Sequence, residues 1–265
     1  KGSQMRIEKI CILGGTGFVG SHLSSRLANQ GYALKLLTRH RERHKKLLVM
    51  PDVQVIQVDD LTPETLQTQF SDCDAVINLI GILNGSEQQF QAVHHDLAVH
   101  ILQACQASGI SRYLHMSALN ADAENSPTSQ YLRSKGAAEQ VVHGDTEQTA
   151  GLSVTSFRPS VIFGPDDSFI NRFASLLKLS PMLPLACPNT RFAPVYVGDV
   201  VSAMVNSLTD ESTFGQAYEL CGPRIYTLKE LVQYTAQLSG QKRIVWGLSD
   251  KLSRTQAKVF DTLFK

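Results

Sequence analysis

A glycine-rich segment near the start of the chain places the strongest constraint on the fold. Residues 14–20 read GGTGFVG and contain the spacing G-x-G-x-x-G. They follow the apolar run 9–13 and open a segment, 17–30, in which Leu23 and Leu27 lie one helical turn apart. Glycines between a strand and a helix let backbone N–H groups approach a pyrophosphate, whose charge the helix N-terminus favours. The pattern predicts a dinucleotide-binding unit. A tight turn without a ligand is the alternative.

Short apolar runs alternate with amphipathic segments over residues 5–165. Runs of strand length lie at 9–13, 34–37, 53–58, 75–80, 112–116 and 154–157. Expected helices lie at 17–30, after the cap pair Thr62-Pro63, at 90–108 and at 129–144. Several runs are apolar on both faces, as in parallel strands covered by helices on two sides. We therefore predict an α/β fold, with residues 5–165 forming a doubly wound Rossmann sheet.

The pattern changes after about residue 165, and residues 166–265 are expected to form a smaller C-terminal substrate lobe, with some elements returning to the main sheet. Expected elements are a helix at 169–179, a strand at 192–197, a helix from 199, a strand at 218–220, a capping-box helix from Thr227 to Gly240, and a helix at 252–264. That last segment predicts that native sequence continues beyond Lys265. Residues 1–4, before Met5, are interpreted as a cloning remnant.

Composition narrows the function classes. The 265 residues carry 25 basic and 24 acidic side chains, a net charge of +1, which gives no electrostatic footprint for nucleic acid. No apolar run approaches the ~18 residues of a membrane span, and none resembles a signal peptide. The five cysteines are scattered without a C-x-x-C pair, which argues against a metal site or a disulfide framework. We therefore expect a cytoplasmic protein without metal, nucleic-acid partner or transmembrane segment.

The end of the second expected strand bears on the choice of cofactor. The sequence there is Thr38-Arg39-His40-Arg41, without the acidic residue that accepts hydrogen bonds from the ribose of NAD. The guanidinium groups of Arg39 and Arg41 suit the 2′-phosphate of NADP. We predict NADP as the preferred cofactor and NAD as the second choice, the alternative being a solvated basic helix start. Asp59 and Asp60 end the third expected strand, where a carboxylate could accept from the adenine amine.

Three polar side chains are predicted to converge near the nicotinamide. Tyr131 and Lys135 are four residues apart on one face of the expected helix 129–144. Ser117 follows the expected strand 112–116, whose carboxyl end faces the ligand crevice of a doubly wound sheet. Lys135 would favour the phenolate of Tyr131 for acid–base work, and Ser117 would hold a substrate oxygen. The alternative is a packed tyrosine with a solvated lysine.

Together these motifs resemble the atypical extended short-chain dehydrogenases/reductases, which are epimerase/dehydratase-like proteins. The resemblance spans nearly the whole chain and rests on residues 14–20, 76–79, 115–118, Tyr131 with Lys135, 158–165 and 194–200. Segments 80–83 and 114–119 are especially similar to the subgroup that contains the nucleotide-binding accessory subunit of respiratory complex I.

The resemblance implies an NAD(P)-binding oxidoreductase or epimerase-like protein with catalytic roles for Ser117, Tyr131 and Lys135. It implies cofactor contacts at Gly14, Thr16, Gly17, Phe18, Val19, Gly20, Arg39, Asp60, Leu79, Ile80, Gly81, Lys135, Pro159, Val161 and Ile162. Relatives that do not turn over substrate keep a second interpretation open. This is a non-catalytic nucleotide-binding accessory protein linked to respiratory complex I or quinone metabolism, located peripherally at the inner membrane. A third interpretation is a regulatory protein that senses the NADPH/NADP ratio.

One position departs from the family pattern. His94 stands where the resemblance implies an asparagine that takes part in a proton relay, so His94 either relays protons or fills space. The substrate is not defined by the sequence. Apolar residues of the C-terminal lobe form either ordinary core or a pocket for a small apolar, quinone-like molecule; they are Phe169, Leu176, Leu177, Met182, Leu183 and Phe192.

Overall fold

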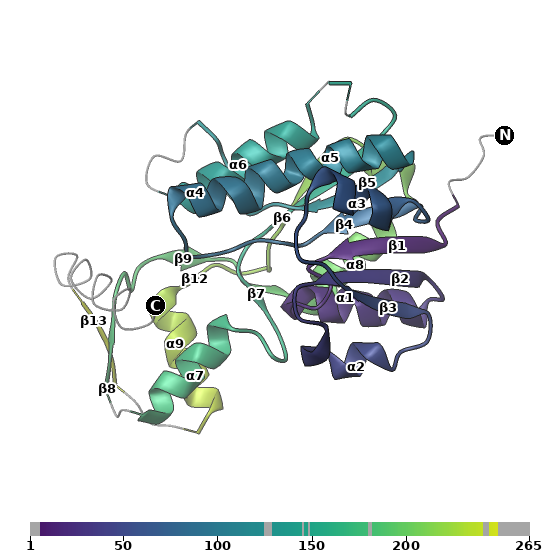
Figure 1. The fold of residues 1–265 in the computed structure, drawn as a ribbon. Helices are drawn as coiled ribbons and strands as arrows, with labels where there is room; N and C mark the ends of the chain where they lie inside the picture. The colour runs from purple at the N-terminus through teal and green to yellow at the C-terminus, as the bar shows by residue number, and fades with distance from the viewer. Residues whose placement is uncertain are drawn as a thin grey trace. The chain divides into compact units, whose positions relative to one another are not determined.

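The computed structural model describes residues 6–124, 129–144, 146–147, 149–179, 182–240 and 244–248. The chain divides into two compact units, both visible in Figure 1. The first unit comprises Lys1–Pro159 and Val197–Leu220, and the second comprises Ser160–Tyr196 and Cys221–Lys265. The chain thus leaves the first unit at residue 159 and returns to it at residue 197. The helix expected at 252–264 lies outside the described residues.

A seven-stranded parallel sheet forms the centre of the first unit, in the order β11-β6-β5-β4-β1-β2-β3. The strands are β1 (Lys9–Leu13), β2 (Ala33–Thr38), β3 (Val53–Gln57), β4 (Ala75–Asn78), β5 (Arg112–Met116), β6 (Ser153–Pro159) and β11 (Gln216–Leu220). This arrangement confirms the predicted doubly wound fold. The strand order reverses between β1 and β4, and such a switch point is where ligands bind in open α/β sheets.

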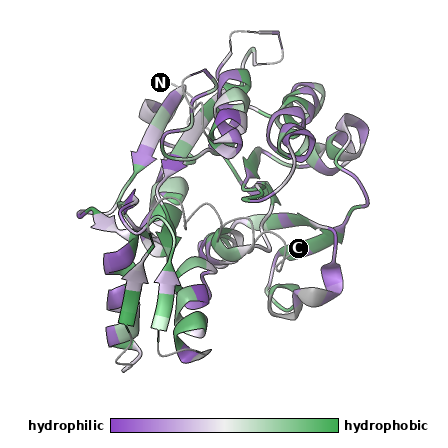
Figure 2. Ribbon diagram, turned by 90° about the vertical axis from the view of Figure 1, so that its left-hand side faces the viewer, coloured by the Kyte–Doolittle hydropathy of each residue, from purple (hydrophilic) through white to green (hydrophobic). Residues whose placement is uncertain are grey.

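Helices cover both faces of this sheet (Figure 1). One face carries α3 (Pro63–Phe70), α5 (Leu97–Ser108) and α6 (Gln130–Val142), and the other carries α1 (Phe18–Asn29) and α8 (Val197–Ser207). Short helical segments are η1 (Arg41–Arg43), α2 (Lys45–Leu48), α4 (Glu87–Phe90) and η3 (Glu211–Thr213). In Figure 2 the helices show both green and purple residues, as expected for elements with one face on a core. Leu66, Ile101 and Tyr113 are among the residues of that core.

The long helix expected at 90–108 is not a single regular α-helix, so that prediction was wrong in detail. It begins earlier, at α4, because Ser86 and Gln89 form a capping box. A π-helical segment, η2 (Gln91–Asp96), then joins α4 to α5. Gly109 ends α5 in the left-handed conformation, with φ at 69°.

The second unit is built from three two-stranded ribbons and two helices within its described part. The ribbons pair β7 (Ile162–Phe163) with β10 (Val195–Tyr196), β9 (Arg191–Phe192) with β12 (Tyr226–Thr227), and β8 (Met182–Leu185) with β13 (Ile244–Gly247). The helices are α7 (Phe169–Leu179) and α9 (Leu228–Leu238), and α9 starts with the predicted capping box of Thr227 and Glu230.

One prediction for the second unit is corrected by these elements. The strand expected at 192–197 is interrupted at Ala193 and Pro194, and its two halves belong to different ribbons, β9 and β10.

The apolar residues of the second unit are expected from the sequence to form either ordinary core or a pocket. Leu177 and Leu183 are buried in a small core with Val232 and Val245, which agrees with the first alternative for these two residues. Among the described residues, no helix combines the length and the apolar character needed to cross a bilayer.

Candidate functional site

The glycine loop follows β1 and enters α1, and its glycines serve two different purposes. A Cβ at Gly20 would lie 2.1 Å from the carbonyl oxygen of Gly14, so the tight turn itself requires glycine there. Within the described residues, a Cβ at Gly17 would meet that same oxygen alone, at 3.3 Å, and Gly17 has an ordinary φ of −77°. The protein's own packing therefore constrains Gly17 far less than Gly20. A bound ligand would give a reason for glycine at this position.

The start of α1 suits an anion. Its N-cap is Gly17, which has no side chain to accept from the first N–H groups, and the first turn consists of Phe18, Val19 and Gly20. By contrast, Thr62, Ser129 and Thr227 each cap the helix that follows them with a side-chain oxygen. Uncapped N–H groups and the helix dipole favour a negatively charged group. The loop therefore fits the pyrophosphate of a dinucleotide.

The chain after β4 runs beside this loop. The N–H group of Leu79 donates to the carbonyl oxygen of Leu13 at 2.9 Å, and that of Ile80 donates to the buried Asn78 Oδ1 at 3.0 Å. A Cβ on Gly14 would lie 3.2 Å from the nitrogen of Ile80. The structure thus brings the predicted cofactor residues 79–81 next to the glycine loop at the switch point.

Lys135 reaches the same edge of the sheet from α6. It is 4% exposed, and its Nζ donates to the carbonyl oxygens of Met116 at 2.9 Å and Ile80 at 3.4 Å. Within the described part of the chain it has no carboxylate partner, and burial lowers its pKa to about 8. A Cβ on Gly81 would lie 3.1 Å from Nζ. A buried cation without a counter-ion thus lies against backbone at the predicted ligand edge.

Ser117 lies directly beyond the end of β5 and is 2% exposed. Its hydroxyl is one of two buried side-chain polar atoms, within the described residues, that have no hydrogen-bond partner; the other is His115 Nε2. Unpartnered buried polar atoms are rare in native proteins, because each costs about 1–3 kcal/mol. The Ser117 hydroxyl is therefore a candidate contact for a substrate or cofactor oxygen.

Tyr131 lies at the start of α6 with its ring packed on two aromatic neighbours. Its ring centroid is 5.6 Å from that of His94 and 6.3 Å from that of Phe90. Burial raises the pKa of Tyr131, which is opposite to the expected preference for the phenolate. The physical reason is that the Lys135 ammonium is bonded to backbone carbonyls, while the phenol loses hydration.

His94 is buried in η2, and both of its ring nitrogens have partners. Nε2 lies 3.1 Å from the N–H group of Ile82, from which it accepts. Nδ1 lies 2.7 Å from the hydroxyl of Ser134. Burial and the Lys135 cation lower the pKa of His94 to about 4, so the ring is neutral near pH 7. Sequence reasoning singled out His94 but missed Ile82 and Ser134.

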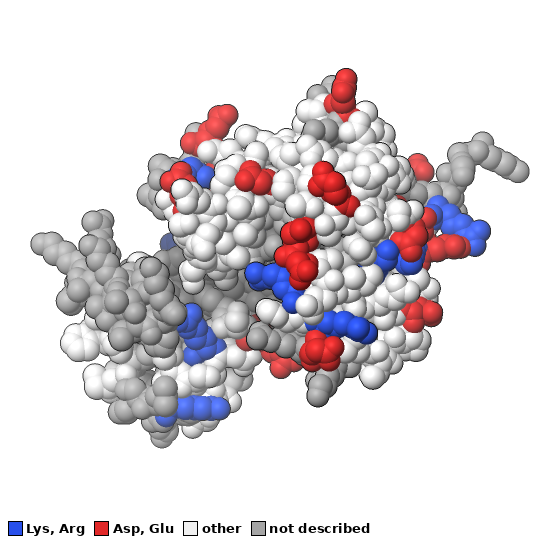
Figure 3. All heavy atoms as spheres, viewed as in Figure 1, with Lys and Arg blue, Asp and Glu red and all other residues white. Residues whose placement is uncertain are grey.

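The residues predicted to select the ribose lie on the surface. Arg39 and Arg41 are both exposed, directly after β2 and in η1. In the described residues neither side chain forms an ion pair, so both guanidinium groups are available to a phosphate. The face shown in Figure 3 carries basic and acidic side chains interspersed. This mixture agrees with the net charge of +1.

The remaining predicted cofactor residues do not all lie in the first unit, and one of them has a structural role. Asp60 Oδ1 accepts hydrogen bonds from the Thr62 N–H group and from the hydroxyls of Thr62 and Thr65, so it supports the start of α3. Those hydrogen bonds lower the pKa of Asp60. Pro159 ends β6 in the first unit, whereas Val161 and Ile162 belong to the second unit.

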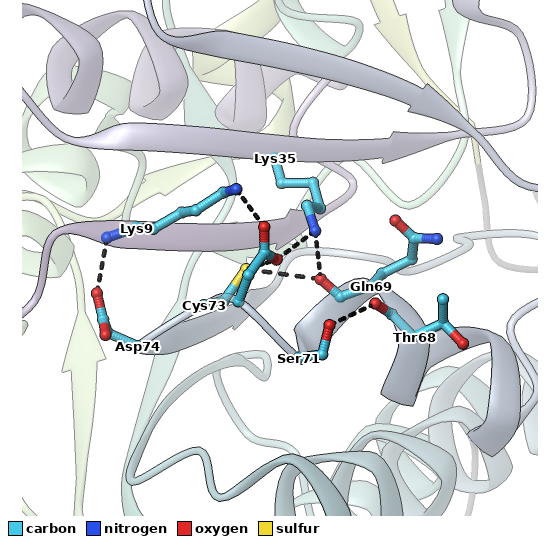
Figure 4. Close-up of polar contacts among 8 residues, drawn as sticks. Lys9, Lys35, Thr68, Gln69, Ser71, Cys73 and Asp74 are labelled. Carbon is cyan, nitrogen blue, oxygen red and sulfur yellow. Dashed lines mark hydrogen bonds and ion pairs between the residues drawn. The ribbon is translucent and has the colours of Figure 1, made fainter.

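The opposite, amino-terminal edge of the sheet holds other cations, with partners (Figure 4). Lys9 and Lys35 both form ion pairs with Asp72, and Lys35 also donates to the carbonyl oxygen of Gln69 at 2.8 Å. The fully buried Arg112 donates five hydrogen bonds and covers the ring of Phe214 at 4.5 Å. Its acceptors are the carbonyl oxygens of Ser153, Ser207 and Leu208 and the hydroxyls of Thr155 and Thr213.

Comparison with known proteins agrees with this architecture. A model of the NAD dependent epimerase/dehydratase family matches residues 10–221. The chain belongs to this family. It is 34% identical over 230 residues to NADH dehydrogenase (ubiquinone) 1 alpha subcomplex subunit 9, mitochondrial, of Arabidopsis thaliana, covering 84% of this chain and 56% of that protein. This similarity confirms the predicted relation to the complex I accessory subgroup.

A ceramide reductase of Caulobacter vibrioides is 29% identical over 197 residues, which cover 74% of this chain and 59% of the relative. The chain therefore spans a little over half the length of these relatives. Among solved structures, an epimerase from Methanothermobacter thermautotrophicus has a TM-score of 0.79 at 17% identity, covering 92% of this chain and 80% of that one.

A UDP-glucuronic acid 4-epimerase from Bacillus cereus, in complex with UDP-glucuronic acid and NAD, has a TM-score of 0.78 at 20% identity. That match covers 91% of this chain and 86% of the epimerase. At these identities the two solved structures show the shared fold.

Proposed function

We propose that the chain binds NADP(H) at the glycine loop and acts as an oxidoreductase or epimerase-like enzyme at the carboxyl edge of its sheet. The supporting observation concerns two buried groups at that edge. Among the residues that the structure describes, the Lys135 cation has no carboxylate partner and the Ser117 hydroxyl has no hydrogen-bond partner. Both groups are costly to the protein on its own. A bound dinucleotide and substrate would supply partners for both.

The residues fit a dinucleotide. Residues 17–20 would hold the pyrophosphate, residues 79–81 would lie along it, and Lys135 would donate to the nicotinamide ribose. When bound, the nicotinamide supplies or accepts the hydride. Tyr131 is protonated at neutral pH, so it would enter a reduction as an acid and donate its proton to the carbonyl oxygen of the substrate. Ser117 would donate a hydrogen bond to the same oxygen.

The preference for NADP follows from Arg39 and Arg41, which are free of ion pairs in the part of the chain that the structure describes. A charge-assisted contact to the 2′-phosphate contributes about 1.5–3 kcal/mol, or roughly ten- to a hundredfold in affinity. Titration calorimetry of Arg39→Ala should show weaker NADP binding and nearly unchanged NAD binding. Arg26→Ala, at the far end of α1, is the matched control. Equal or tighter binding of NAD by the wild type would refute the preference.

The loop assignment is tested by Gly17→Val. Because a Cβ at Gly17 meets one atom of the described chain, the Gly14 carbonyl oxygen at 3.3 Å, the variant should remain folded after a small local shift, and its side chain should block the pyrophosphate. Circular dichroism checks the fold, and fluorescence titration with NADPH checks binding. A folded variant that keeps its affinity for NADPH would show that the loop is not the binding site.

A second function is favoured by His94. Its Nε2 accepts from the backbone N–H group of Ile82, which cannot pass on its proton, so this nitrogen is not open to a proton relay. We therefore also propose a nucleotide-binding accessory role, associated with the respiratory chain at the inner membrane, as the name of the Arabidopsis relative suggests. Native mass spectrometry would show whether a dinucleotide or a quinone-like molecule co-purifies.

The rate of cofactor exchange separates these two functions. An oxidoreductase must exchange its spent dinucleotide in every turnover, whereas an accessory protein would retain it as a structural element. Exchange of co-purified dinucleotide against isotopically labelled NADPH measures this rate. Rapid exchange together with hydride transfer to small apolar carbonyl substrates would rule out the accessory role.

A further inference from the structure

We propose that His94 is a positioning residue that fastens the loop of residues 79–85 to the start of α6. It would thereby hold the dinucleotide-contacting backbone against Lys135 and Tyr131. This inference rests on the proposed function for its effect on cofactor binding. The fastening itself rests on contacts within the chain.

The first support is a chain of hydrogen bonds through the imidazole. Because Nε2 accepts from the Ile82 N–H group at 3.1 Å, the ring proton is on Nδ1. Nδ1 therefore donates to the hydroxyl of Ser134 at 2.7 Å, and that hydroxyl donates to the carbonyl oxygen of Tyr131 at 2.9 Å. One neutral tautomer thus connects the loop after β4 to the first turn of α6.

The second support is the backbone that carries His94. The residue lies in η2, the π-helical segment between α4 and α5. A π segment accommodates an extra residue, and removing it would turn the positions that precede it by about 100° relative to α5. Such segments occur often at functional sites. The irregularity therefore aims the ring at both Ile82 and Ser134.

The third support is the closeness of the loop to Lys135. A Cβ on Gly81 would lie 3.1 Å from Lys135 Nζ and 3.5 Å from His94 Nε2. Ile80, one residue earlier, supplies a carbonyl oxygen to the Lys135 ammonium. A shift of residues 80–82 would therefore remove an acceptor from Lys135 and move the backbone expected beside the cofactor. Through this loop, His94 acts on both without contacting the ligand.

Aromatic packing holds the ring in this orientation. The centroid of His94 lies 5.6 Å from that of Phe90, in α4, and 5.6 Å from that of Tyr131. Burial and the adjacent Lys135 keep the imidazole neutral near pH 7, and neutrality is what allows Nε2 to accept. The geometry thus provides a rigid acceptor rather than a mobile proton carrier.

The test uses His94→Phe, which keeps a ring between Phe90 and Tyr131 but removes both nitrogens. His95→Phe is the matched control, because His95 is the adjacent residue and its Nδ1 contacts the carboxylate of Asp96 instead. We expect His94→Phe to raise the hydrogen-exchange rate of the Ile82 amide at least tenfold and to weaken NADPH binding about tenfold. His95→Phe should change neither quantity.

Rescue separates positioning from simple loss of packing. In His94→Gln the side-chain oxygen can accept from the Ile82 N–H group, so both Ile82 protection and NADPH affinity should recover in part. Nitrogen-15 spectra of the wild-type ring should show Nδ1 protonated and Nε2 unprotonated at pH 7. A ring protonated on Nε2 would overturn the inference.

The remaining outcomes are also decisive. Unchanged exchange of Ile82 in His94→Phe would show that the ring does not fasten the loop. Faster exchange with wild-type NADPH affinity would show that the fastened loop has no effect on the ligand, and the positioning role would fail. If the wild type binds no dinucleotide while Ile82 is deprotected in His94→Phe, the proposed function fails and the fastening stands.

Discussion

The two edges of the parallel sheet treat buried positive charge in opposite ways. At the amino-terminal edge, the Arg112 guanidinium is surrounded by five acceptors, and Lys9 and Lys35 share the carboxylate of Asp72. At the carboxyl-terminal edge, Lys135 has two backbone carbonyls as hydrogen-bond partners in the described chain, and the hydroxyl of Ser117 has none. In the described chain, the polar groups at the amino-terminal edge have more partners within the protein than Lys135 and Ser117 have at the carboxyl-terminal edge.

The difference predicts that the buried cations at the amino-terminal edge contribute to the free energy of unfolding, whereas Lys135 lowers it. Removing a buried cation that many acceptors or a carboxylate surround leaves those groups buried without a partner, whereas removing a buried cation with few partners relieves a desolvation cost. Substitutions at the two edges should therefore change the free energy of unfolding in opposite directions.

The largest effect is expected for Arg112→Met. The variant would leave three carbonyl oxygens and two hydroxyls buried without their donor, and we expect a loss of about 3–5 kcal/mol in the free energy of unfolding. Urea unfolding followed by circular dichroism measures it. Should Arg112→Met be too unstable to purify, Phe214→Leu removes just the ring contact and should cost far less. A loss below about 1 kcal/mol for Arg112→Met would contradict the role of the amino-terminal edge.

Lowering the pH should reduce the free energy of unfolding first through the buried histidines, and only at lower pH through the ion pairs of the amino-terminal edge. Burial lowers the pKa of His94, His115 and His143, so the unfolded chain takes up protons that the folded chain does not. The stability that these neutral rings preserve is complete above pH 6.5, the ordinary histidine value, and declines as the pH falls below it; for His94 the decline continues to about pH 4. For His94 alone the loss is about 3 kcal/mol.

Asp72, whose pKa is lowered by its two lysines, keeps its charge throughout this range. Urea unfolding should give a lower free energy of unfolding at pH 4.5 than at pH 7. In His94→Phe this difference should be smaller, because one of the three titrating histidines is gone. A wild-type stability that is flat between these two pH values would contradict the expectation.

A pair of lysine variants compares the edges directly. Lys135→Met removes a buried charge whose pKa is lowered from 10.5 to about 8, so it should raise the free energy of unfolding of the ligand-free chain by about 1–3 kcal/mol. Lys35→Met removes a buried, ion-paired charge and should lower it by a similar amount. Thermal unfolding with and without NADPH measures both, and Lys135→Met should also lose the stabilisation by NADPH. If both variants changed the free energy of unfolding in the same direction, the proposed difference between the two edges would be wrong.

The smallest effect is expected for Lys9→Met. Lys9 shares Asp72 with Lys35, but its side chain is 23% exposed. Exposed pairs contribute about 0–1 kcal/mol, and salt screens them. We expect a loss below about 1 kcal/mol that shrinks further in 1 M salt, measured by urea unfolding. A larger loss in the free energy of unfolding that salt does not reduce would show that Lys9 behaves like the buried cations Lys35 and Arg112.

Much of the fold was predictable because local patterns and tertiary packing agree. The strands at 9–13 and 112–116 and the helix at 169–179 occupy the predicted residues, since each is a compact apolar run or an amphipathic segment with clear ends. The π segment was not predictable in this way, because one extra residue in a turn hardly alters hydrophobic periodicity. The break at Pro194 was visible in the sequence but was outweighed by the apolar run around it.

The sequence allowed us to predict which residues lie together at the candidate site, but not the direction in which their pKa values shift. The order of strands and loops places Ser117 and Lys135 at one edge, as the topology of parallel sheets requires. The pKa of Tyr131 moves the other way from the prediction because its burial depends on Phe90 and His94, which lie 41 and 37 residues away in the sequence. The catalytic and cofactor roles of Ser117, Tyr131 and Lys135 stay predictions.

The late return of the chain to the main sheet has a consequence for synthesis on the ribosome. Strand β11 pairs with β6, yet the residues of the second unit from 160 to 196 emerge between them. Until residues 207–213 are available, Arg112 lacks three of its five acceptors, and the edge of β6 is open to pairing with another chain. A nascent chain halted near residue 196 should therefore depend on chaperones, although most of its first unit has already been made.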